Sequence, residues 1–460
     1  MLFRQVIHED LGCASYLIAD IGGRVAAVVD PQWDIEPYLR LARLHDVRIE
    51  HVIETHNHAD HVSGHGRLAQ ATGAKIHIHE LADADYPHEA IADGWRLDLG
   101  QVEIEAIHTP GHRPEHTAFL VSDGGRGDGP IALLCGDSLF VGDVARPDLA
   151  IEPRDGAAAL YHSLNDRLFD LPDSVEVWPG HLGGSMCGSA GIDHKTSSTI
   201  AFERAHNRAL GFGSEAEFVA DATASLGDRP PNAERIVALN RGPFTEEPGA
   251  PTPLSPRAVE VAIADGAILV DARTTDQFDE AHIPCAISAS AYDTGFATKV
   301  AQVVPAEAEL IVVAASDGYE LEAADLLASV GLRVRGFLAG GMTAWRSEGH
   351  AVNRVERIDP QTLADRLAGG EEIAVLDVRG DSEFTAGHIP GSVSIPYPEL
   401  LERLAEVPRD ASIATVCSGG KRSGLAASLL QREGFKGVIH VADGGVGTWE
   451  RQGHPVESGD

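Results

Sequence analysis

The chain of 460 residues, 43% of them apolar, is too long for one ordinary core, and we expect about two to four domains. Its formal net charge of −34 argues against non-specific binding to nucleic acid or an anionic membrane, because a polyanion repels both. No apolar run is long enough to span a bilayer, and the N-terminal MLFRQVIHED lacks the apolar core of a signal peptide. The five scattered cysteines suit free thiols in a reducing compartment, so we predict a cytoplasmic location.

Residues 1–228 are predicted to form one domain of alternating strands and helices. The runs RVAAVVDP (24–31) and IEHVIETH (49–56) are apolar and bounded by turn or polar residues, as buried strands are. Between them, DIEPYLRLARLH (34–45) has the periodicity of a helix. VEIEAIHTPGH (102–112) begins with the period-two alternation of a half-buried strand. The first domain is therefore predicted to be α/β.

A proline-rich linker is predicted at residues 229–256. Its prolines are Pro230, Pro231, Pro243, Pro248, Pro251, Pro253 and Pro256. An internal repeat follows, since AILVDARTTDQFDEAHIP resembles AVLDVRGDSEFTAGHIP, and GFLAGGMTAW resembles VADGGVGTW. Strand–loop–helix order recurs in both copies, 257–355 and 356–460. We expect two small α/β domains with parallel sheets.

Metal-ligating residue types are concentrated in ETHNHADHVSG, residues 54–64. The candidates there are His56, His58, Asp60 and His61. Residues two apart on a short loop after a strand can point into one cavity, which suits metal ligation. Three further candidates, His112, Asp137 and His181, occur beside glycine or small residues, where the backbone can approach closely. The pattern predicts a metal site, and ligand density alone leaves open whether it holds one metal or two.

Four segments, THNHADH, TPGH, GDSLF and PGH, occur in the order typical of one known family. On these motifs the first domain resembles the metallo-β-lactamase fold. The resemblance implies an αββα sandwich with the metal at the ends of two facing sheets. Because a fold does not fix a function, the resemblance leaves the reaction undecided.

Two activities within this family fit the residues. Hydrolases similar to glyoxalase II use two metals, and all the ligands for two are present: His56, His58, His112, Asp137, Asp60, His61 and His181. Persulfide dioxygenases keep these residues and bind one iron through three of them, which here are His56, His112 and Asp137. Two imidazoles and a carboxylate, with positions left open, suit non-haem Fe(II) and O₂ chemistry. The other four residues would then orient the ligands.

Three local features favour the dioxygenase. Ala59 precedes Asp60, where glyoxalase-like enzymes carry a larger residue. GDVARPDL (142–149) resembles the Arg-[Pro/Thr]-Asp-[Leu/Phe] signature of persulfide dioxygenases, which makes Arg146 a candidate substrate contact. GGSMCGSAGIDHKTSSTIAFERAHN resembles the segment after the last histidine in dioxygenases fused to sulfurtransferases, and Cys187 in it is a further candidate contact. The other cysteines of this domain, Cys13 and Cys135, are expected to be packing residues.

The second repeat copy resembles a rhodanese domain. The matching residues are Asp377, Arg379, His388, Trp449 and the loop CSGGKRS, from Cys417 to Ser423. A thiol that ends a strand and precedes a helix should lie in an anion cradle, because backbone N–H groups and the helix dipole point at its sulfur. We predict that Cys417 is the nucleophile and that Arg422 grips sulfite oxygens. Further substrate contacts are predicted at Ser418, Gly419, Gly420, Lys421 and Ser423.

The first repeat copy lacks this chemistry. Aligned on the second copy, it has Ala314 opposite the cysteine and Tyr319 opposite the arginine. Asp317 and Glu320 add negative charge where an anion would have to bind. Cys285 falls where the second copy has a glycine, so it is not a displaced nucleophile. We expect this central domain to be a spacer or a docking surface.

The fusion itself favours the dioxygenase, since a rhodanese shares persulfide sulfur, thiosulfate and sulfite with a persulfide dioxygenase and shares no intermediate with a thioesterase. We therefore predict an Fe(II) persulfide dioxygenase with one iron per chain. It would oxidise a low-molecular-weight thiol persulfide with O₂ to sulfite, as in bacterial hydrogen sulfide detoxification. Sulfurtransfer at Cys417 would form or use thiosulfate. No nucleic-acid or membrane partner is expected, and a homo-oligomer is possible.

Three alternatives stay open at this point. The first is a dinuclear zinc or iron thioester hydrolase of the glyoxalase II type, fused to a sulfurtransferase. The second is a persulfide sensor or carrier in which the metal is structural. The third is a diiron flavoprotein-like redox role, for which the sequence offers no flavin domain. Two metal equivalents and thioester turnover would identify the first.

Overall fold

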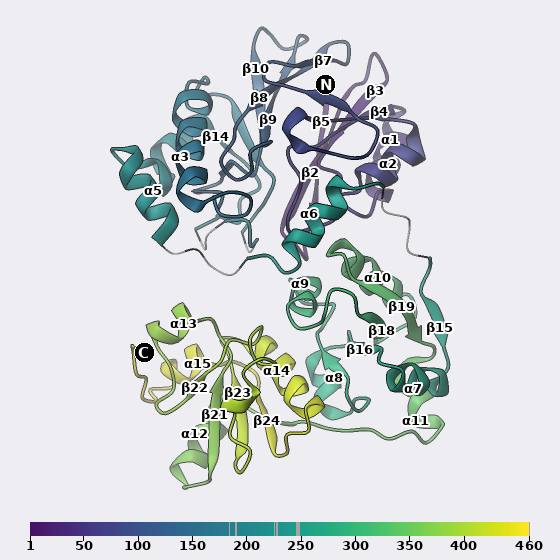
Figure 1. The fold of residues 1–460 in the computed structure, drawn as a ribbon, viewed down its shortest axis with the longest axis vertical. Coiled ribbons are helices and arrows are strands. Elements are labelled where there is room, and N and C mark those ends of the chain that lie inside the picture. The colour runs from purple at the N-terminus through teal and green to yellow at the C-terminus, as the bar shows by residue number, and fades with distance from the viewer. Residues whose placement is uncertain (184, 189–190, 225, 227–228, 245–248, 460) are drawn as a thin grey trace. The chain divides into compact units, whose positions relative to one another are not determined.

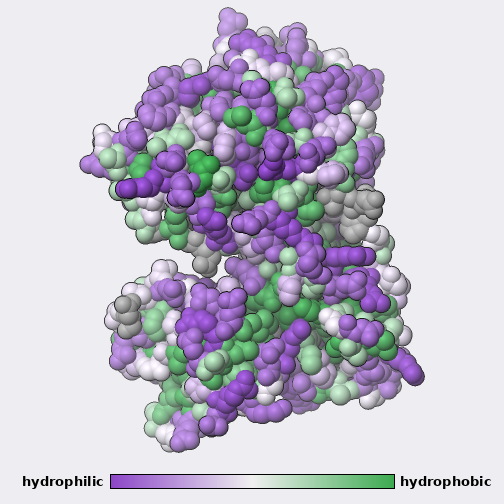
Figure 2. Space-filling model, viewed as in Figure 1, coloured by the Kyte–Doolittle hydropathy of each residue, from purple (hydrophilic) through white to green (hydrophobic). Residues whose placement is uncertain are grey.

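The structure is a computed structural model that describes residues 1–183, 185–188, 191–224, 226, 229–244 and 249–459 (Figure 1). The predicted domain end at residue 228 and the linker residue Pro248 lie outside the described residues. The chain divides into two compact units, Met1–Glu247 with Ala328–Gly331, and Pro248–Leu327 with Leu332–Asp460. Hydrophilic residues predominate on the face that Figure 2 shows. None of the described helices is long and apolar enough to cross a membrane.

The first unit contains two six-stranded sheets. In spatial order the first sheet has β1 (Leu2–His8), β2 (Cys13–Asp20), β3 (Val25–Val29), β4 (Arg48–Ile53), β5 (Lys75–His79) and β6 (Glu89–Ile91). The second has β14 (Ser198–Thr199), β13 (Glu176–Pro179), β10 (Pro130–Gly136), β9 (Thr117–Asp123), β8 (Val102–His108) and β7 (Arg96–Asp98). A hairpin of β11 (Leu139–Phe140) and β12 (Asp143–Val144) follows β10. In the second sheet, β8 and β10 are both antiparallel to β9, so they end at the same edge.

Helices cover the outer faces of both sheets, except that the last of them, Ala233–Arg241, lies at the end of the sandwich against the loop after β4 (Figure 1). They are α1 (Glu36–His45), α2 (His65–Thr72), α3 (Pro153–Ser163), α4 (Ile200–His206), α5 (Glu215–Ala224) and α6 (Ala233–Arg241). Short 3-10 turns lie at Glu80–Ala82 (η1) and Arg208–Leu210 (η3), and a π-helical turn at Leu164–Leu168 (η2). Tyr38 of α1 and Leu68 of α2 pack against the first sheet, and Leu160 of α3 and Phe218 of α5 pack against the second.

A central apolar layer joins the two sheets of the sandwich. Tyr16 and Ile18 of β2 meet Phe119 of β9 and Leu134 of β10 in this layer, and all four are almost fully buried. The alternation of inward and outward side chains along these strands follows from their period-two pattern. Truncating Phe119 to alanine would cost about 3–5 kcal/mol by the usual cavity effect. The predicted αββα sandwich is confirmed.

The second unit contains two five-stranded parallel sheets that share one topology. In spatial order the first has β15 (Thr252–Leu254), β19 (Arg333–Leu338), β18 (Glu309–Val313), β16 (Ile268–Asp271) and β17 (Ile287–Ser288). The second has β20 (Glu356–Ile358), β24 (Val438–Val441), β23 (Ser412–Val416), β21 (Ile373–Asp377) and β22 (Val393–Ser394). The prediction of two α/β domains with parallel sheets is confirmed.

Helices alternate with the strands in both copies, as parallel connections require. The first copy has α7 (Pro256–Ala264), α8 (Thr275–Glu280), α9 (Phe296–Ala301), α10 (Tyr319–Ser329) and α11 (Gly341–Ser347). The second has α12 (Pro360–Ala368), α13 (Asp381–Ala386), a 3-10 turn η4 (Leu404–Glu406), α14 (Lys421–Arg432) and α15 (Val446–Arg451). The carboxyl ends of β18 and β23 therefore carry equivalent loops, the second of which begins with Cys417.

Candidate functional site

Three of the predicted metal ligands lie on turns that follow strands of the sandwich. His56 follows β4 of the first sheet, and His112 and Asp137 follow β8 and β10 of the second. Gly136 makes the last of these turns possible, because its φ is +47° and a Cβ there would lie 2.7 Å from Nε2 of His116. Strand ends of both sheets thus bring residues from distant parts of the chain to one buried point.

Three polar atoms converge there without a hydrogen-bond partner. Nε2 of His56 lies 3.9 Å from Oδ2 of Asp137, and Nε2 of His112 lies 3.5 Å from the same oxygen. All three side chains are fully buried, and none of the three atoms has a partner among the described residues. Buried polar atoms are normally paired, so this convergence indicates a site for a ligand that would complete them.

The charge states of these residues suit a metal cation. Burial, together with neighbouring histidines, holds the pKa of His56 well below its ordinary value, and burial also lowers the pKa of His112. Both imidazoles are therefore neutral and offer a lone pair at neutral pH. Burial alone would raise the pKa of Asp137, but the charge and hydrogen bond of His181 outweigh it and lower this pKa strongly. Asp137 is therefore an ionised carboxylate.

Hydrogen bonds at the far side of each ligand fix its orientation. Nδ1 of His56 donates to Oγ1 of Thr55 (2.9 Å), whose hydroxyl donates to Asp30 (2.8 Å). Nδ1 of His112 donates to the carbonyl oxygen of Arg146 (2.9 Å). Such bonds select the tautomer that leaves Nε2 free for a metal. Sequence reasoning missed Thr55 and Asp30, since neither stands out in its local pattern.

His116 has a comparable supporting role that its sequence pattern did not indicate. Its Nε2 accepts the backbone N–H of Asp137 (2.9 Å), and its Nδ1 lies 3.1 Å from the carbonyl oxygen of Thr109. The imidazole therefore fixes the backbone at the turn that presents the carboxylate.

Two imidazoles and one carboxylate on one side of a buried point fit a first-row divalent metal. Two imidazole nitrogens and a carboxylate oxygen are donors that Fe(II) accepts in proteins, and three donors would occupy only part of its coordination positions. Zinc would accept the same donor types. The residues present therefore fit the iron that the resemblance to persulfide dioxygenases implies.

The ring of His58 lies beside that of His56, with centroids 4.3 Å apart, and its two buried nitrogens also lack a hydrogen-bond partner among the described residues. Its Nε2 lies 3.3 Å from Oδ1 of Asp30 and 3.6 Å from Oε2 of Glu54. Burial and the nearby charge of Asp30 raise the pKa of Glu54 well above its ordinary value. His58, Asp30 and Glu54 form a buried group of their own that could hold a cation. The structure separates His58 from the three converging atoms.

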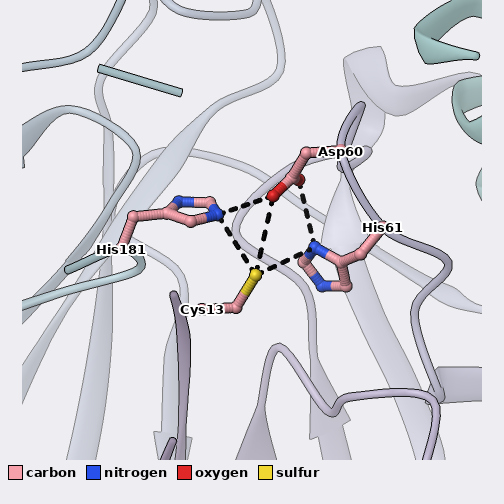
Figure 3. A group of neighbouring side chains, drawn as sticks. All are labelled: Cys13, Asp60, His61 and His181. Atoms are coloured by element: carbon pink, nitrogen blue, oxygen red, sulfur yellow. Dashed lines mark hydrogen bonds and ion pairs between the residues drawn. The ribbon is translucent and has the colours of Figure 1, made fainter. Parts of the chain in front are cut away.

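The other second-metal candidates, Asp60, His61 and His181, gather around Cys13 (Figure 3). Sγ of Cys13 lies 3.6 Å from Oδ2 of Asp60, 3.6 Å from Nδ1 of His61 and 3.4 Å from Nε2 of His181. Cys13 was expected to be a packing residue. It is buried, and its sulfur also contacts these three polar side chains. Separately, its backbone forms an isolated β-bridge with that of His181.

His181 links this group to the triad. Its Nδ1 lies 2.8 Å from Oδ1 of Asp137, and its Nε2 lies 2.8 Å from Oδ2 of Asp60. Burial would lower the pKa of His181, but Asp137 and the other nearby anionic groups outweigh burial and raise it well above its ordinary value. Both nitrogens of His181 therefore face carboxylates, one of Asp137 and one of Asp60.

The predicted substrate contacts Arg146 and Cys187 lie near the triad in different ways. The guanidinium of Arg146 is buried and makes two hydrogen bonds to Asp148, of 2.7 and 2.9 Å. Sγ of Cys187 belongs to a buried group with Asp137 and His181, whose ligand atoms all lie within 4.8 Å of one another. Burial raises the pKa of the Cys187 thiol well above its ordinary value.

The Cys417 loop has the predicted cradle. The N–H of Gly420 donates to Sγ of Cys417 (3.0 Å), and Oγ of Ser423 lies 3.4 Å from the same sulfur. Gly420 has a φ of +94°, a left-handed conformation that glycine adopts without strain. No atom would lie within 4 Å of a Cβ on Gly419.

Both cations of the loop are engaged by carboxylates. Arg422 makes hydrogen bonds of 2.5 and 2.9 Å to Glu383 and one of 2.9 Å to Oγ of Ser418. Lys421 lies 2.6 Å from Asp293, a residue of the central domain. Burial would raise the pKa of Glu383, but its bond to Arg422 outweighs burial and lowers it. Binding of an anion by Arg422 would therefore compete with Glu383.

The central domain has a cavity of about 400 Å³ at the equivalent loop. Ala314, Asp317 and Glu320 line it, together with Arg273 and Arg346. No thiol lies among its lining residues. Ala314 therefore follows β18 at the position where Cys417 follows β23, and the central domain has no thiol at this position.

Comparisons with known proteins agree with this division. Residues 8–181 match the metallo-beta-lactamase superfamily, and residues 255–348 and 359–452 each match the rhodanese-like domain. The mitochondrial persulfide dioxygenase ETHE1 of Homo sapiens is 30% identical over 222 residues, which are 48% of this chain and 79% of that protein. The cytoplasmic hydroxyacylglutathione hydrolase of Arabidopsis thaliana is 35% identical over 169 residues, 36% of this chain and 62% of that protein.

A sulfurtransferase of Allochromatium vinosum is 32% identical over 102 residues, which are 22% of this chain and 94% of that protein. A crystal structure of a metallo-beta-lactamase from Staphylococcus aureus subsp. aureus COL covers 74% of this chain and 98% of its own, with 27% identity and a TM-score of 0.65. The chain therefore belongs to the metallo-β-lactamase superfamily, among relatives that include persulfide dioxygenases, and it carries two rhodanese-like domains as well.

Proposed function

We propose that the first domain is an Fe(II) persulfide dioxygenase. The reaction is RSSH + O₂ + H₂O → RSH + SO₃²⁻ + 2 H⁺, where R is a low-molecular-weight carrier. The observation that carries the proposal is the convergence of three unpartnered buried atoms, Nε2 of His56, Nε2 of His112 and Oδ2 of Asp137. When bound, the iron supplies a Lewis-acid centre for the persulfide sulfur and for O₂.

The protein's own groups hold and surround this centre. His56, His112 and Asp137 would be the three protein ligands. His181 keeps Oδ2 of Asp137 turned toward the centre by donating to its Oδ1. Asp60 holds the other side of the His181 ring. These fixed dipoles need no reorganisation during the reaction, which is how a preorganised site lowers its barrier.

A cavity of about 650 Å³ offers a place for the thiol carrier. Ala59 and Arg113, which adjoin metal-binding turns, line it together with Arg229 and Arg235. Guanidinium groups at a cavity wall favour anionic ligands, although Arg113 pairs with Glu115, Arg229 pairs with Asp148, and Glu234 also lines the cavity. A carrier with carboxylate or phosphate groups, such as glutathione or coenzyme A, suits this wall.

Two features favour one metal over two. Nε2 of His58 lies 3.3 Å from Asp30 and 3.6 Å from Glu54, and it groups with these carboxylates and not with the three converging atoms. His181, with hydrogen bonds at both nitrogens, stands between the carboxylates that a second metal would use. The second candidate function is a dinuclear thioester hydrolase, favoured by the 35% identity to a hydroxyacylglutathione hydrolase.

We propose further that the last domain is a sulfurtransferase. The Cys417 thiolate attacks the outer sulfur of thiosulfate, an S–S bond forms, and sulfite leaves with the electron pair of the broken S–S bond. The charge balances as E–S⁻ + S–SO₃²⁻ → E–S–S⁻ + SO₃²⁻. The N–H of Gly420 and the hydroxyl of Ser423 support the proposal, because donors beside a sulfur stabilise its negative charge. The reverse step makes thiosulfate.

Metal analysis and O₂ uptake on anaerobically purified protein test the dioxygenase. We expect about one iron per chain, and O₂ consumption with glutathione persulfide. His112→Ala should lose most of the iron and lower uptake by roughly 100-fold or more. His162→Ala, at an exposed side chain of α3, is the matched control and should behave as wild type. Two zinc ions per chain with no O₂ uptake, and turnover of a glutathione thioester, would establish the hydrolase instead.

A further inference from the structure

We propose that Asp279 of the central domain is a positioning residue for the sulfur-carrying loop, acting through His440 of the last domain. The inference rests on the proposed sulfurtransferase activity of Cys417. It gives the central domain, which has no thiol at Ala314, a direct part in that reaction. Both domains belong to one compact unit.

The contact is a continuous hydrogen-bonded path. His440 lies on β24 and is 1% exposed, and Asp279 lies on α8 and is 4% exposed. Nδ1 of His440 lies 2.7 Å from Oδ2 of Asp279. Nε2 of the same ring lies 2.7 Å from the carbonyl oxygen of Gly420. One buried imidazole thus joins a carboxylate of the central domain to the residue that donates to Cys417.

The chemistry of the partners fixes where the hydrogens lie. A carbonyl oxygen only accepts, so Nε2 of His440 carries the hydrogen in its bond to Gly420. Nδ1 faces Oδ2 of Asp279, so the ring and the carboxyl group share a hydrogen across this second contact. Without Asp279 this ring would lose the group that orients it.

The held carbonyl has two consequences for the sulfur. Gly420 presents its N–H to Sγ of Cys417 at 3.0 Å, so fixing the residue through its oxygen also aims its N–H. Ser423 has a single hydroxyl hydrogen, and its Oγ lies near three acceptors: Gly420 O at 3.0 Å, Val441 O at 3.2 Å and Sγ of Cys417 at 3.4 Å. The bond from His440 takes up one of the two lone pairs of the Gly420 oxygen, so His440 competes with Ser423 for this acceptor.

Packing holds the two domains close enough for this path. A Cβ on Gly424 of α14 would lie 2.6 Å from Cγ2 of Thr275, at the start of α8, and 3.1 Å from Cε1 of His440. In addition, the backbone N–H of Ser288 donates to Oγ of Ser428 at 2.9 Å, deeper along α14. The helix that begins the loop therefore rests directly on the central domain.

The repeat itself marks Asp279 as distinctive. Aligning DARTTDQFDEAHIP on DVRGDSEFTAGHIP places it opposite Thr385 of the last domain. The central copy thus has a carboxylate where the active copy has a hydroxyl. A buried carboxylate is costly unless it is paired, and its partner here is on the other copy.

Asp279→Asn in the full chain tests the proposal by steady-state sulfurtransfer from thiosulfate to cyanide. We expect kcat to fall about tenfold, because a misaligned donor stabilises the charged sulfur less, with KM for thiosulfate changed less than about twofold. The rate of Cys417 alkylation by iodoacetamide, followed on its peptide by mass spectrometry, should fall in parallel. Asp276→Asn is the matched control, since Asp276 lies on the same helix, is exposed and pairs with Arg357 rather than with the loop.

A double-mutant cycle separates action through His440 from independent effects. His440→Gln should lower kcat to a similar degree, and the double variant should be no slower than the slower single variant. The proposal would be overturned if the losses of kcat in the two single variants multiplied in the double variant, or if Asp276→Asn lost as much kcat as Asp279→Asn. An unchanged rate of Cys417 alkylation in Asp279→Asn would also overturn it. If Asp279→Asn unfolds, His440→Gln alone must show the lower kcat and the slower alkylation. A wild-type chain without sulfurtransfer would refute the proposed function, and the alkylation rates would still decide this inference.

Discussion

His58 and His56 are two residues apart, yet they serve different groups. The side chain of His56 joins His112 and Asp137, whereas that of His58 turns toward Asp30 and Glu54. Spacing alone could not distinguish them, because any loop that places His56 at a metal leaves His58 within reach as well. What separates them is Asp30, a residue at the end of another strand that also holds Thr55.

This separation predicts that His58→Ala keeps its iron. We expect an iron content near that of wild type, while the free energy of unfolding falls by about 1–3 kcal/mol because two buried acidic side chains lose their partner. Metal analysis and chemical denaturation check the two quantities. The reference variant is His112→Ala, which should lose the metal. Loss of iron from His58→Ala to the same extent would show that His58 is a ligand.

The sequence indicated the triad, while several residues that support it could not be found from the sequence. His56, His112 and Asp137 each lie in a short motif, so neighbouring residues in the sequence mark them as candidates. Cys13 contacts Asp60, which is 47 positions away, and no local pattern marks such a partner. The same holds for Asp279 and His440, which are 161 positions apart. Long-range contacts between polar residues need the fold.

At the scale of elements, the turn after β10 decides where Asp137, the carboxylate proposed to bind the metal, lies. Strand periodicity predicted the sheets, but strand order and the edge at which the strands end came from the structure. The turn needs a residue with positive φ and no side chain, because Thr55 and His116 fill the space beside Gly136. Because the protein interior is closely packed, the backbone of this short turn has little room to move away from a new side chain.

Gly136→Ala should therefore destabilise the first domain and weaken metal binding. The positive φ costs about 1 kcal/mol, and the clash with His116 and Thr55 adds roughly 1–3 kcal/mol. Gly73→Ala is the matched control, since Gly73 has a φ of +78° but nothing lies within 4 Å of its would-be Cβ. Thermal unfolding and iron content measure both variants. Equal losses of stability would mean that backbone strain alone, without crowding at the site, explains the effect.

At the scale of the whole molecule, the two proposed reactions share one compound, sulfite. The first proposed reaction releases sulfite, and the second consumes sulfite when it runs toward thiosulfate. Neither reaction needs the other's residues, because His56, His112 and Asp137 lie in one compact unit and Cys417 in the other. The two activities should therefore be separable by single substitutions.

Cys417→Ser tests this separation in the full chain. With glutathione persulfide and O₂, the wild type should accumulate thiosulfate. Cys417 first takes the outer sulfur of the persulfide, E–S⁻ + GSSH → E–S–S⁻ + GSH, and then passes it to sulfite, E–S–S⁻ + SO₃²⁻ → E–S⁻ + S₂O₃²⁻. The serine variant should consume O₂ within about twofold of the wild-type rate and accumulate sulfite instead, since a serine hydroxyl group carries no sulfane sulfur.

Cys285→Ser, at an exposed thiol, is the control and should still yield thiosulfate. His112→Ala gives the background without oxidation. Loss of O₂ uptake in Cys417→Ser would show that the first site depends on the second, and unchanged thiosulfate formation would mean that another thiol carries the sulfur.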